Sequence, residues 1–174
     1  MKRLTTLFIS IILVAIFASS SNFAQTRGMK YNQSISANPL GLIFGVFNAT
    51  YEQQIAPKNS FTINGSYFTY SDWTAGSIGG SYRFYLLQED VRAIQGFSFG
   101  PMAQVAFWSW GGPGTFSYDG GTVFYIGAEA AYKWVFSGGF VVEPSIALRF
   151  GVNKLEGLGG FSSYGIGVNL GYAW

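Results

Sequence analysis

The chain has 174 residues, of which 49% are hydrophobic and only 10% are charged, and it contains neither cysteine nor histidine. The missing residue types exclude disulfides, thiolate metal sites and catalysis by a Ser–His–acid triad. Loss of Lys2 and Arg3 with the leader described below lowers the ten basic residues to eight, equal to the eight acidic ones. A neutral chain with so few charges has no electrostatic footprint for nucleic acid, which excludes that partner.

Residues 1–24 have the form of a secretory signal peptide, with Lys2 and Arg3, then an apolar stretch at 4–18, then small residues. The apolar stretch is short for crossing about 30 Å of hydrocarbon. This favours a cleaved signal over a membrane-anchoring helix. Cleavage after Ala24 and cleavage after Ser20 both fit the spacing. The sequence therefore predicts a signal peptide at 1–24 and one domain at 25–174.

Segments of alternating apolar and small or polar residues follow, separated by Gly, Pro, Asn and Asp clusters. No apolar run after the signal is long enough for a transmembrane helix, so any membrane span must be made of strands. The first segment is the weakest, and the breaker Asn38-Pro39-Leu40-Gly41 follows it. An even number of strands places both termini on the same side of a membrane. We predict strands at 29–37, 44–56, 60–70, 75–87, 96–108, 122–136, 140–152 and 164–174.

The closing segment, YGIGVNLGYAW, shows which face meets lipid. Its even-numbered residues are large and apolar, whereas its odd-numbered residues are Gly, Asn and Ala. A soluble, lipocalin-like barrel would be apolar inside and would carry many charges outside. Small groups instead suit the cramped interior of an eight-stranded barrel. We therefore predict an all-β, eight-stranded antiparallel up-and-down transmembrane β-barrel with lipid on its apolar face.

The turn at 137–139 fixes the register of one hairpin. A three-residue loop pairs Phe136 with Phe140 and keeps both apolar stripes on one face, whereas a two-residue loop would not. The same register places Lys133 opposite Glu143 on the polar face.

Six charged residues share the polar face, three of them acids and three bases, and buried charges must be paired. We interpret them as a structural salt-bridge network inside the barrel, with a proton or ion relay as the alternative. They are Glu52, Arg83, Glu129, Lys133, Glu143 and Arg149.

Aromatic residues gather near the predicted strand ends, as they do in the girdles of membrane barrels. A platform that stacks sugars or nucleotides is the alternative. The residues are Trp73, Trp108, Trp110, Tyr132, Trp134, Tyr172 and Trp174. The loop at 111–121, GGPGTFSYDGG, is not a phosphate-binding loop, because it lacks Gly-Lys-Ser/Thr and precedes a strand. Together with 153–163 it should face outside the cell.

Five segments of the sequence are similar to those of a known protein family. They are NPLGLIFGVFNATYEQQI (38–55), GGSYRFYL (79–86), GFSFGP (96–101), AEAAYKWVF (128–136) and GIGVNLGYAW (165–174). Together they resemble a family of small outer-membrane β-barrel proteins of Gram-negative bacteria that share a domain of unknown function. The resemblance implies an eight-stranded barrel in the outer membrane and supplies no catalytic residues. The closing Trp174 resembles the signal read by outer-membrane assembly machinery, with Trp in place of the more usual Phe.

These observations predict a small, non-enzymatic outer-membrane barrel with a structural or surface-interaction role through its outer loops. Its expected partners are outer-membrane lipid and the assembly machinery, and we expect no cofactor and no metal. The extracellular ligand stays open. One alternative is a lipid-modifying enzyme, with Ser145, Lys133 or a Glu129–Glu143 pair as catalytic groups. The other is a secreted lipocalin-like carrier.

Overall fold

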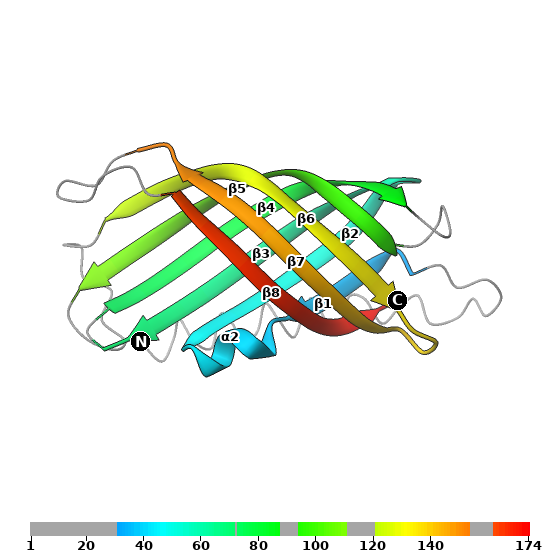
Figure 1. Ribbon diagram of the computed structural model, residues 1–174, viewed down its shortest axis with the longest axis horizontal. Coiled ribbons are helices and arrows are strands. Elements are labelled where there is room, and N and C mark those ends of the chain that lie inside the picture. Colours follow the sequence, from blue (N-terminus) through cyan, green and yellow to red (C-terminus); the bar gives the residue numbers. More distant parts are fainter. Residues whose placement is uncertain (1–30, 72, 88–93, 111–120, 154–161) are drawn as a thin grey trace, which may run out of the picture.

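The computed structural model describes residues 31–71, 73–87, 94–110, 121–153 and 162–174. In these ranges the chain forms a closed barrel in which each strand pairs with the next and the last pairs with the first, all antiparallel (Figure 1). The predicted signal peptide lies outside the described residues. The strands are β1 (Gln33–Ala37), β2 (Val46–Ala56), β3 (Asn59–Tyr70), β4 (Trp73–Leu87), β5 (Gly96–Trp110), β6 (Thr122–Val135), β7 (Phe140–Gly151) and β8 (Ser162–Ala173).

The predicted fold class, an eight-stranded antiparallel up-and-down barrel, is confirmed, and so is the assignment of its faces. Ile126 and Leu148 point away from the barrel and are 58% and 50% exposed, whereas Ser98 and Ala131 point inward and are buried. Alternating residues of a strand lie on opposite faces, so in the described strands the outward face is mainly apolar and the inward face is mainly small or polar. A lipocalin-like barrel requires the opposite arrangement. In the described residues, no helix is long and apolar enough to cross a bilayer.

The β6–β7 hairpin has the predicted register. Trp134 pairs with Val142 and Ala131 with Ser145, as a three-residue turn requires. Phe136 and Phe140 close the turn through a backbone hydrogen bond of 2.8 Å.

The connection from β1 to β2 corrects the sequence prediction. Asn38-Pro39-Leu40-Gly41 does not only break the first strand, because Pro39–Ile43 forms a short helix, α2. The Asn38 side chain caps this helix by accepting hydrogen bonds from the N–H groups of Leu40 and Gly41, at 3.0 and 3.2 Å. Proline fits the first turn because its missing N–H would have no partner there. The second strand consequently starts at Val46 rather than at residue 44.

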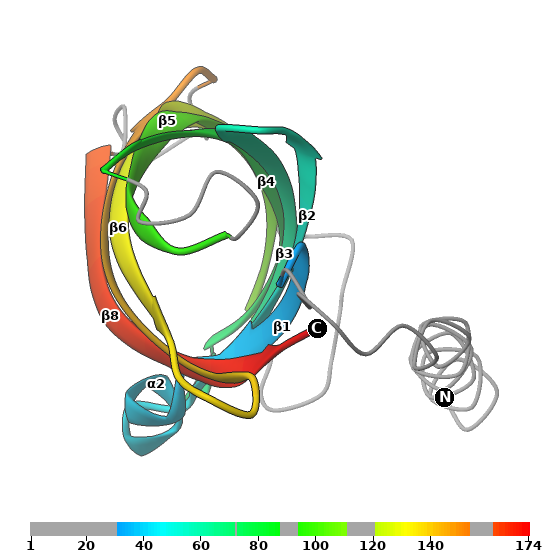
Figure 2. The ribbon, with the colours of Figure 1, turned by 90° about the vertical axis from the view of Figure 1, so that its right-hand side faces the viewer.

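Because α2 begins so early, β1 is much shorter than its neighbours. Its pairing with β8 ends at Ala37 opposite Leu170, and its pairing with β2 ends at Ala37 opposite Ala49. Beyond these residues β8 continues to Ser162, paired only with β7. Figure 2 shows α2 outside the ring of strands, beside β1 and β8. Beyond the end of β1 no described strand joins β8 to β2, and α2 contacts both of them instead. We call this interruption of the sheet the gap.

The end of the barrel that carries the C-terminus is closed more tightly than the other. Ile94, just before β5, is fully buried there, and its N–H donates to the carbonyl of Tyr31 at 2.9 Å. The gap and α2 belong to the opposite half, which we call the loop half because the long connections 111–121 and 152–161 leave from it.

Candidate functional site

Arg83 of β4 is the centre of a charge cluster that crosses the interior. Its Nε donates to Oε1 of Glu129 at 2.5 Å, and its Nη1 lies 2.7 Å from Oε2 of Glu52 and 3.0 Å from Oε2 of Glu143. Nη2 makes a second bond to Glu143, at 3.2 Å. The three carboxylates come from β2, β6 and β7. One guanidinium thus joins both sides of the barrel, which its planar fork of five donors allows.

Lys133 of β6 completes the cluster. Its Nζ forms ion pairs with Glu52 and with Glu143, the latter at 3.0 Å, and donates to Oγ of Ser34 at 2.9 Å. The predicted contact of Lys133 with Glu143 is therefore present. Lys133 is 1% exposed and Arg83 3%, and Glu52 and Glu143 are buried as well, whereas Glu129 is partly exposed to the cavity.

Hydroxyl and amide groups add further hydrogen bonds to the three carboxylates. Tyr85 and Ser60 donate to Oε1 of Glu52 at 2.6 and 2.5 Å. Asn169 donates to Glu143 at 3.2 Å, and Ser81 to Glu129 at 2.6 Å. A buried network is tolerated when its members have partners, and this one meets that condition. The five joined charged residues form a layer across the interior, which we call the floor. They are Glu52, Arg83, Glu129, Lys133 and Glu143.

Arg149 does not join the floor, although sequence reasoning placed it in the same network. It lies on β7 opposite Ser163 and Gly127, six residues further along the strand than Glu143. Within the described residues it makes no ion pair, and its Nε is buried without a hydrogen-bond partner. The five joined residues contain three acids and two bases, so Arg149 balances their net charge from a distance.

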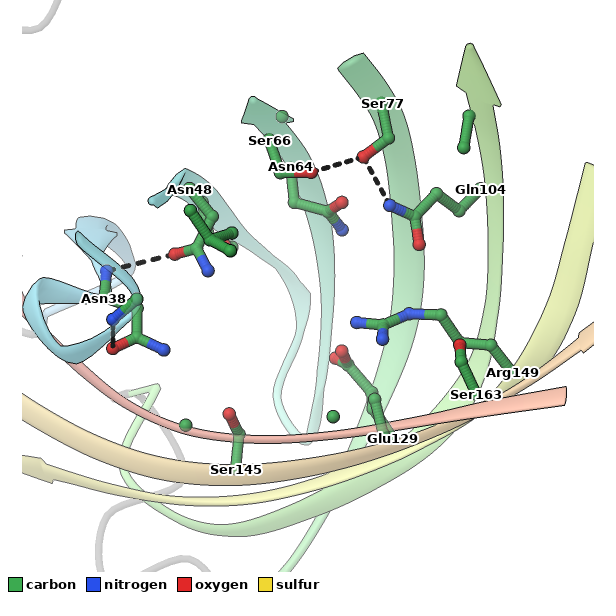
Figure 3. Close-up of a pocket in the computed structure, with 18 of the residues that line it drawn as sticks. Asn38, Asn48, Asn64, Ser66, Ser77, Gln104, Glu129, Ser145, Arg149 and Ser163 are labelled. Carbon is green, nitrogen blue, oxygen red and sulfur yellow. Dashed lines mark hydrogen bonds between the residues drawn. The ribbon is translucent and has the colours of Figure 1, made fainter. Parts of the chain in front are cut away.

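A cavity of about 450 Å³ lies above the floor, in the loop half. Arg83 of the floor is one of its lining residues. Asn38, Glu129, Ser145 and Arg149 line it as well (Figure 3). Asn48, Asn64, Ser66, Ser77 and Gln104 add polar groups on its other side. Ser77 there contacts Ser66 at 2.6 Å and accepts from Gln104 at 2.5 Å.

Of the catalytic groups considered above, Lys133, Glu129 and Glu143 belong to the ion-pair network, whereas Ser145 lines the cavity. The serine that contacts Lys133 is Ser34, which is buried within the floor, and no hydrogen bond joins Ser145 to Lys133 in the part of the chain that is described. Glu129 and Glu143 both pair with Arg83. The described residues contain no group of His, Cys, Asp or Glu side chains able to hold a metal ion. Three isolated acids of the predicted loops, Asp72, Asp119 and Glu156, lie outside the described residues.

The aromatic residues divide between the two faces, which corrects the girdle prediction for one of them. Trp108 points inward, lines the cavity and packs against Ala106, Val123 and Tyr125. Even-numbered residues of β5 face the interior, so the inward position of Trp108 could have been predicted from the alternation. On the outer face, Tyr132 contacts Trp134 and Tyr172 stacks on Trp174, with ring centroids 4.6 and 6.3 Å apart. The side chains of Trp73 and Trp110, and the loop 111–120, are outside the described residues.

Sequence reasoning missed the uncharged polar residues of the site, among them Tyr85, Ser60 and Asn38. Tyr85 and Ser60 share the inward face with Arg83 and Glu52, so the alternation that identified the charges could have identified them too. Asn38 has no such signal, because it follows the last residue of β1 and its inward position depends on α2.

Comparison with known proteins adds one likeness of fold. No family model matches the chain, and no curated protein matches it. The chain is similar to the N-terminal β-barrel domain of OprF from Pseudomonas aeruginosa, with 15% sequence identity and a TM-score of 0.49, over 83% of this chain and 98% of that domain. The resemblance to a family of small outer-membrane barrels stays a prediction, whereas the eight-stranded barrel itself follows from the strand pairing of this chain.

Proposed function

We propose that this chain is a small outer-membrane β-barrel, non-enzymatic, with a structural or surface-interaction role in the cell envelope. The observation that carries the proposal is the inverted polarity of the barrel. Large apolar side chains such as Phe124, Ile126 and Leu148 cover its outside, while buried charges cross its inside. Water around such a surface would be unfavourable, whereas acyl chains fit it.

The floor supports a barrel that does not conduct solutes from one side to the other. Arg83, Lys133 and their three carboxylates fill the cross-section with paired, buried groups. An eight-stranded barrel has little room beyond its own side chains. A solute would therefore have to break several ion pairs to pass.

The proposal includes the route to the membrane. Residues 1–24 would direct export and be removed, and Trp174 would be read by the assembly machinery as the closing aromatic residue. With both termini in the periplasm, the cavity and the loops 111–121 and 153–163 would face outside the cell. The outer loops would then be available to an extracellular partner.

Cell fractionation combined with heat-modifiable gel mobility tests the membrane placement. The full chain should sediment with outer membranes, and the unboiled protein should migrate differently from the boiled protein, because a folded barrel resists the detergent. The purified protein in vesicles should also fail to accelerate the efflux of small sugars. A chain that stays soluble without detergent would contradict the placement, and sugar efflux would contradict the closed floor.

A further inference from the structure

The gap in the barrel wall exposes one edge of β8. Gln33 and Trp174 exchange both backbone hydrogen bonds, at 3.1 and 3.0 Å, so even-numbered residues of β8 direct their N–H and C=O groups toward β1. Continuing the register beyond Ala37 and Leu170 brings Val168 opposite Pro39, which has no N–H and belongs to α2. The backbone groups of Val168, Ile166 and Tyr164 thus face the gap rather than a strand.

The gap separates two spaces of different character. Inside lies the polar cavity of about 450 Å³, and outside, beneath α2, lies a smaller pocket of about 190 Å³. Leu42, Phe47 and Leu170 are among the residues that line the outer pocket. Asn38 lines both spaces. A molecule with a polar head and an apolar tail could therefore lie across the wall at this point.

The inner side of the gap offers hydrogen-bond donors. The guanidinium of Arg149 lies over Gly165, where a Cβ would be 2.9 Å from Nη1, and the amide of Asn38 lies over Gly167, where a Cβ would be 2.5 Å from Nδ2. Asn38 uses its oxygen to cap α2, which leaves its NH₂ group directed at β8. The Arg149 and Asn38 side chains thus pack against the inner face of β8 beside the gap, because Gly165 and Gly167 have no side chains there.

Arg149 offers a direct site for an anion, because its charge is offset by the floor only from a distance. Glu129, the acid that shares the cavity, already bonds Arg83 and Ser81. Arg149 has no ion pair in the described residues, and its Nε is buried without a partner. A guanidinium binds a carboxylate through two parallel hydrogen bonds, and such bonds are stronger when buried. An oxyanion would supply the acceptor that this side chain lacks.

We propose that the cavity binds a single-chain carboxylate amphiphile, with its head group at Arg149 and Asn38 and its alkyl chain leaving through the gap beneath α2. This inference rests on the proposed membrane placement, since the chain continues into the acyl layer. Ile43 and Phe44 are 75% and 73% exposed beside the gap and extend the apolar surface there. The outer pocket has room for one alkyl chain, which disfavours lipids with two.

Binding of radiolabelled dodecanoate to the full protein in uncharged phosphatidylcholine vesicles tests the head-group site. Retention above empty vesicles should saturate near one molecule per protein, while acetate and dodecanol compete at least tenfold more weakly. Arg149→Gln should weaken binding at least tenfold and Arg149→Lys less. Lys58→Gln, which removes an exposed cation at the far end of the barrel, should change nothing. Equal binding by native protein and Arg149→Gln, or equal competition by acetate, would overturn the proposal.

The exit of the chain through the gap has its own test, which uses the absence of cysteine. Spin labels at Ile43→Cys, beside the gap, and at Ile78→Cys, on the outward face of β4, should respond differently to a fatty acid with a nitroxide in mid-chain. We expect saturable broadening at position 43 only, and equal responses would overturn the exit route. Heat-modifiable mobility shows that each variant is folded. Protein that folds in vesicles but binds no dodecanoate refutes this inference alone, whereas protein that does not enter vesicles refutes the membrane placement.

Discussion

Replacing Arg83 by methionine should be the most damaging single change in the floor. The substitution removes three of the five ion pairs between described residues, together with four hydrogen bonds. Hydrogen bonds to charged groups contribute about 1.5–3 kcal/mol each, so four of them set an upper limit of about 6–12 kcal/mol. The carboxylates retain other donors, including Lys133, Ser60 and Ser81. The loss must therefore be smaller than this limit.

Removal of one partner from a buried ion pair costs about 3–5 kcal/mol, because the remaining charge stays buried. We expect Arg83→Met to lower the free energy of unfolding by that amount. Urea titration of the protein in vesicles, followed by heat-modifiable mobility, measures it. With a slope of about 2 kcal/mol per M, the midpoint should fall by about 2 M.

Arg149→Met is the matched control, because it makes the same exchange at a guanidinium that has no ion pair among the described residues. It should change the free energy of unfolding by less than about 1 kcal/mol in the absence of ligand. The reasoning is refuted if the two variants lose equal stability, or if Arg83→Met loses less than about 1 kcal/mol.

Three further changes test other parts of the barrel. Ile126→Arg, on the outward face, should cost about 2–4 kcal/mol in vesicles, whereas Ile55→Arg, on the outward face at the end of β2, should cost about 0–1 kcal/mol; equal urea midpoints would contradict the lipid-facing assignment. Gly100→Ala should destabilise by about 1–3 kcal/mol, because its Cβ would collide with the backbone of β4. The control Gly65→Ala has space and should be tolerated, so similar unfolding midpoints would argue against the collision. Tyr85→Phe removes a buried hydrogen bond to a carboxylate and should cost about 1.5–3 kcal/mol by urea titration; an unchanged midpoint would show that the bond contributes nothing.

Strand periodicity predicted most of the barrel because every strand has the same two environments. Where large apolar residues alternate with small ones, as from Tyr164 to Tyr172, the face of each residue follows from its number alone. The three-residue turn then fixed the contact of Lys133 with Glu143. Both predictions depend only on local geometry, which a sequence contains.

The parts that escaped prediction depend on how strands are staggered around the closed barrel. Arg149 shares its face with Glu143 but lies six positions further along β7, and the stagger of neighbouring strands decides which acids it can reach. The helix α2 is missed for a different reason. Asn-Pro is a turn signal as well as a helix start, and five residues are too few to show a helical period.

The two halves of the interior separate the ion pairs of the floor from the proposed binding site. In the floor, Arg83 and Lys133 join carboxylates of three strands, so any movement of those strands breaks buried ion pairs. The loop half has a cavity in place of packed charges, and there the wall lacks part of one strand. Changes at Arg149 or Asn38 therefore act on a region that the floor does not need for its own contacts. The interrupted sheet above the floor therefore supports the proposal that a ligand would enter from the membrane and would not pass through the barrel.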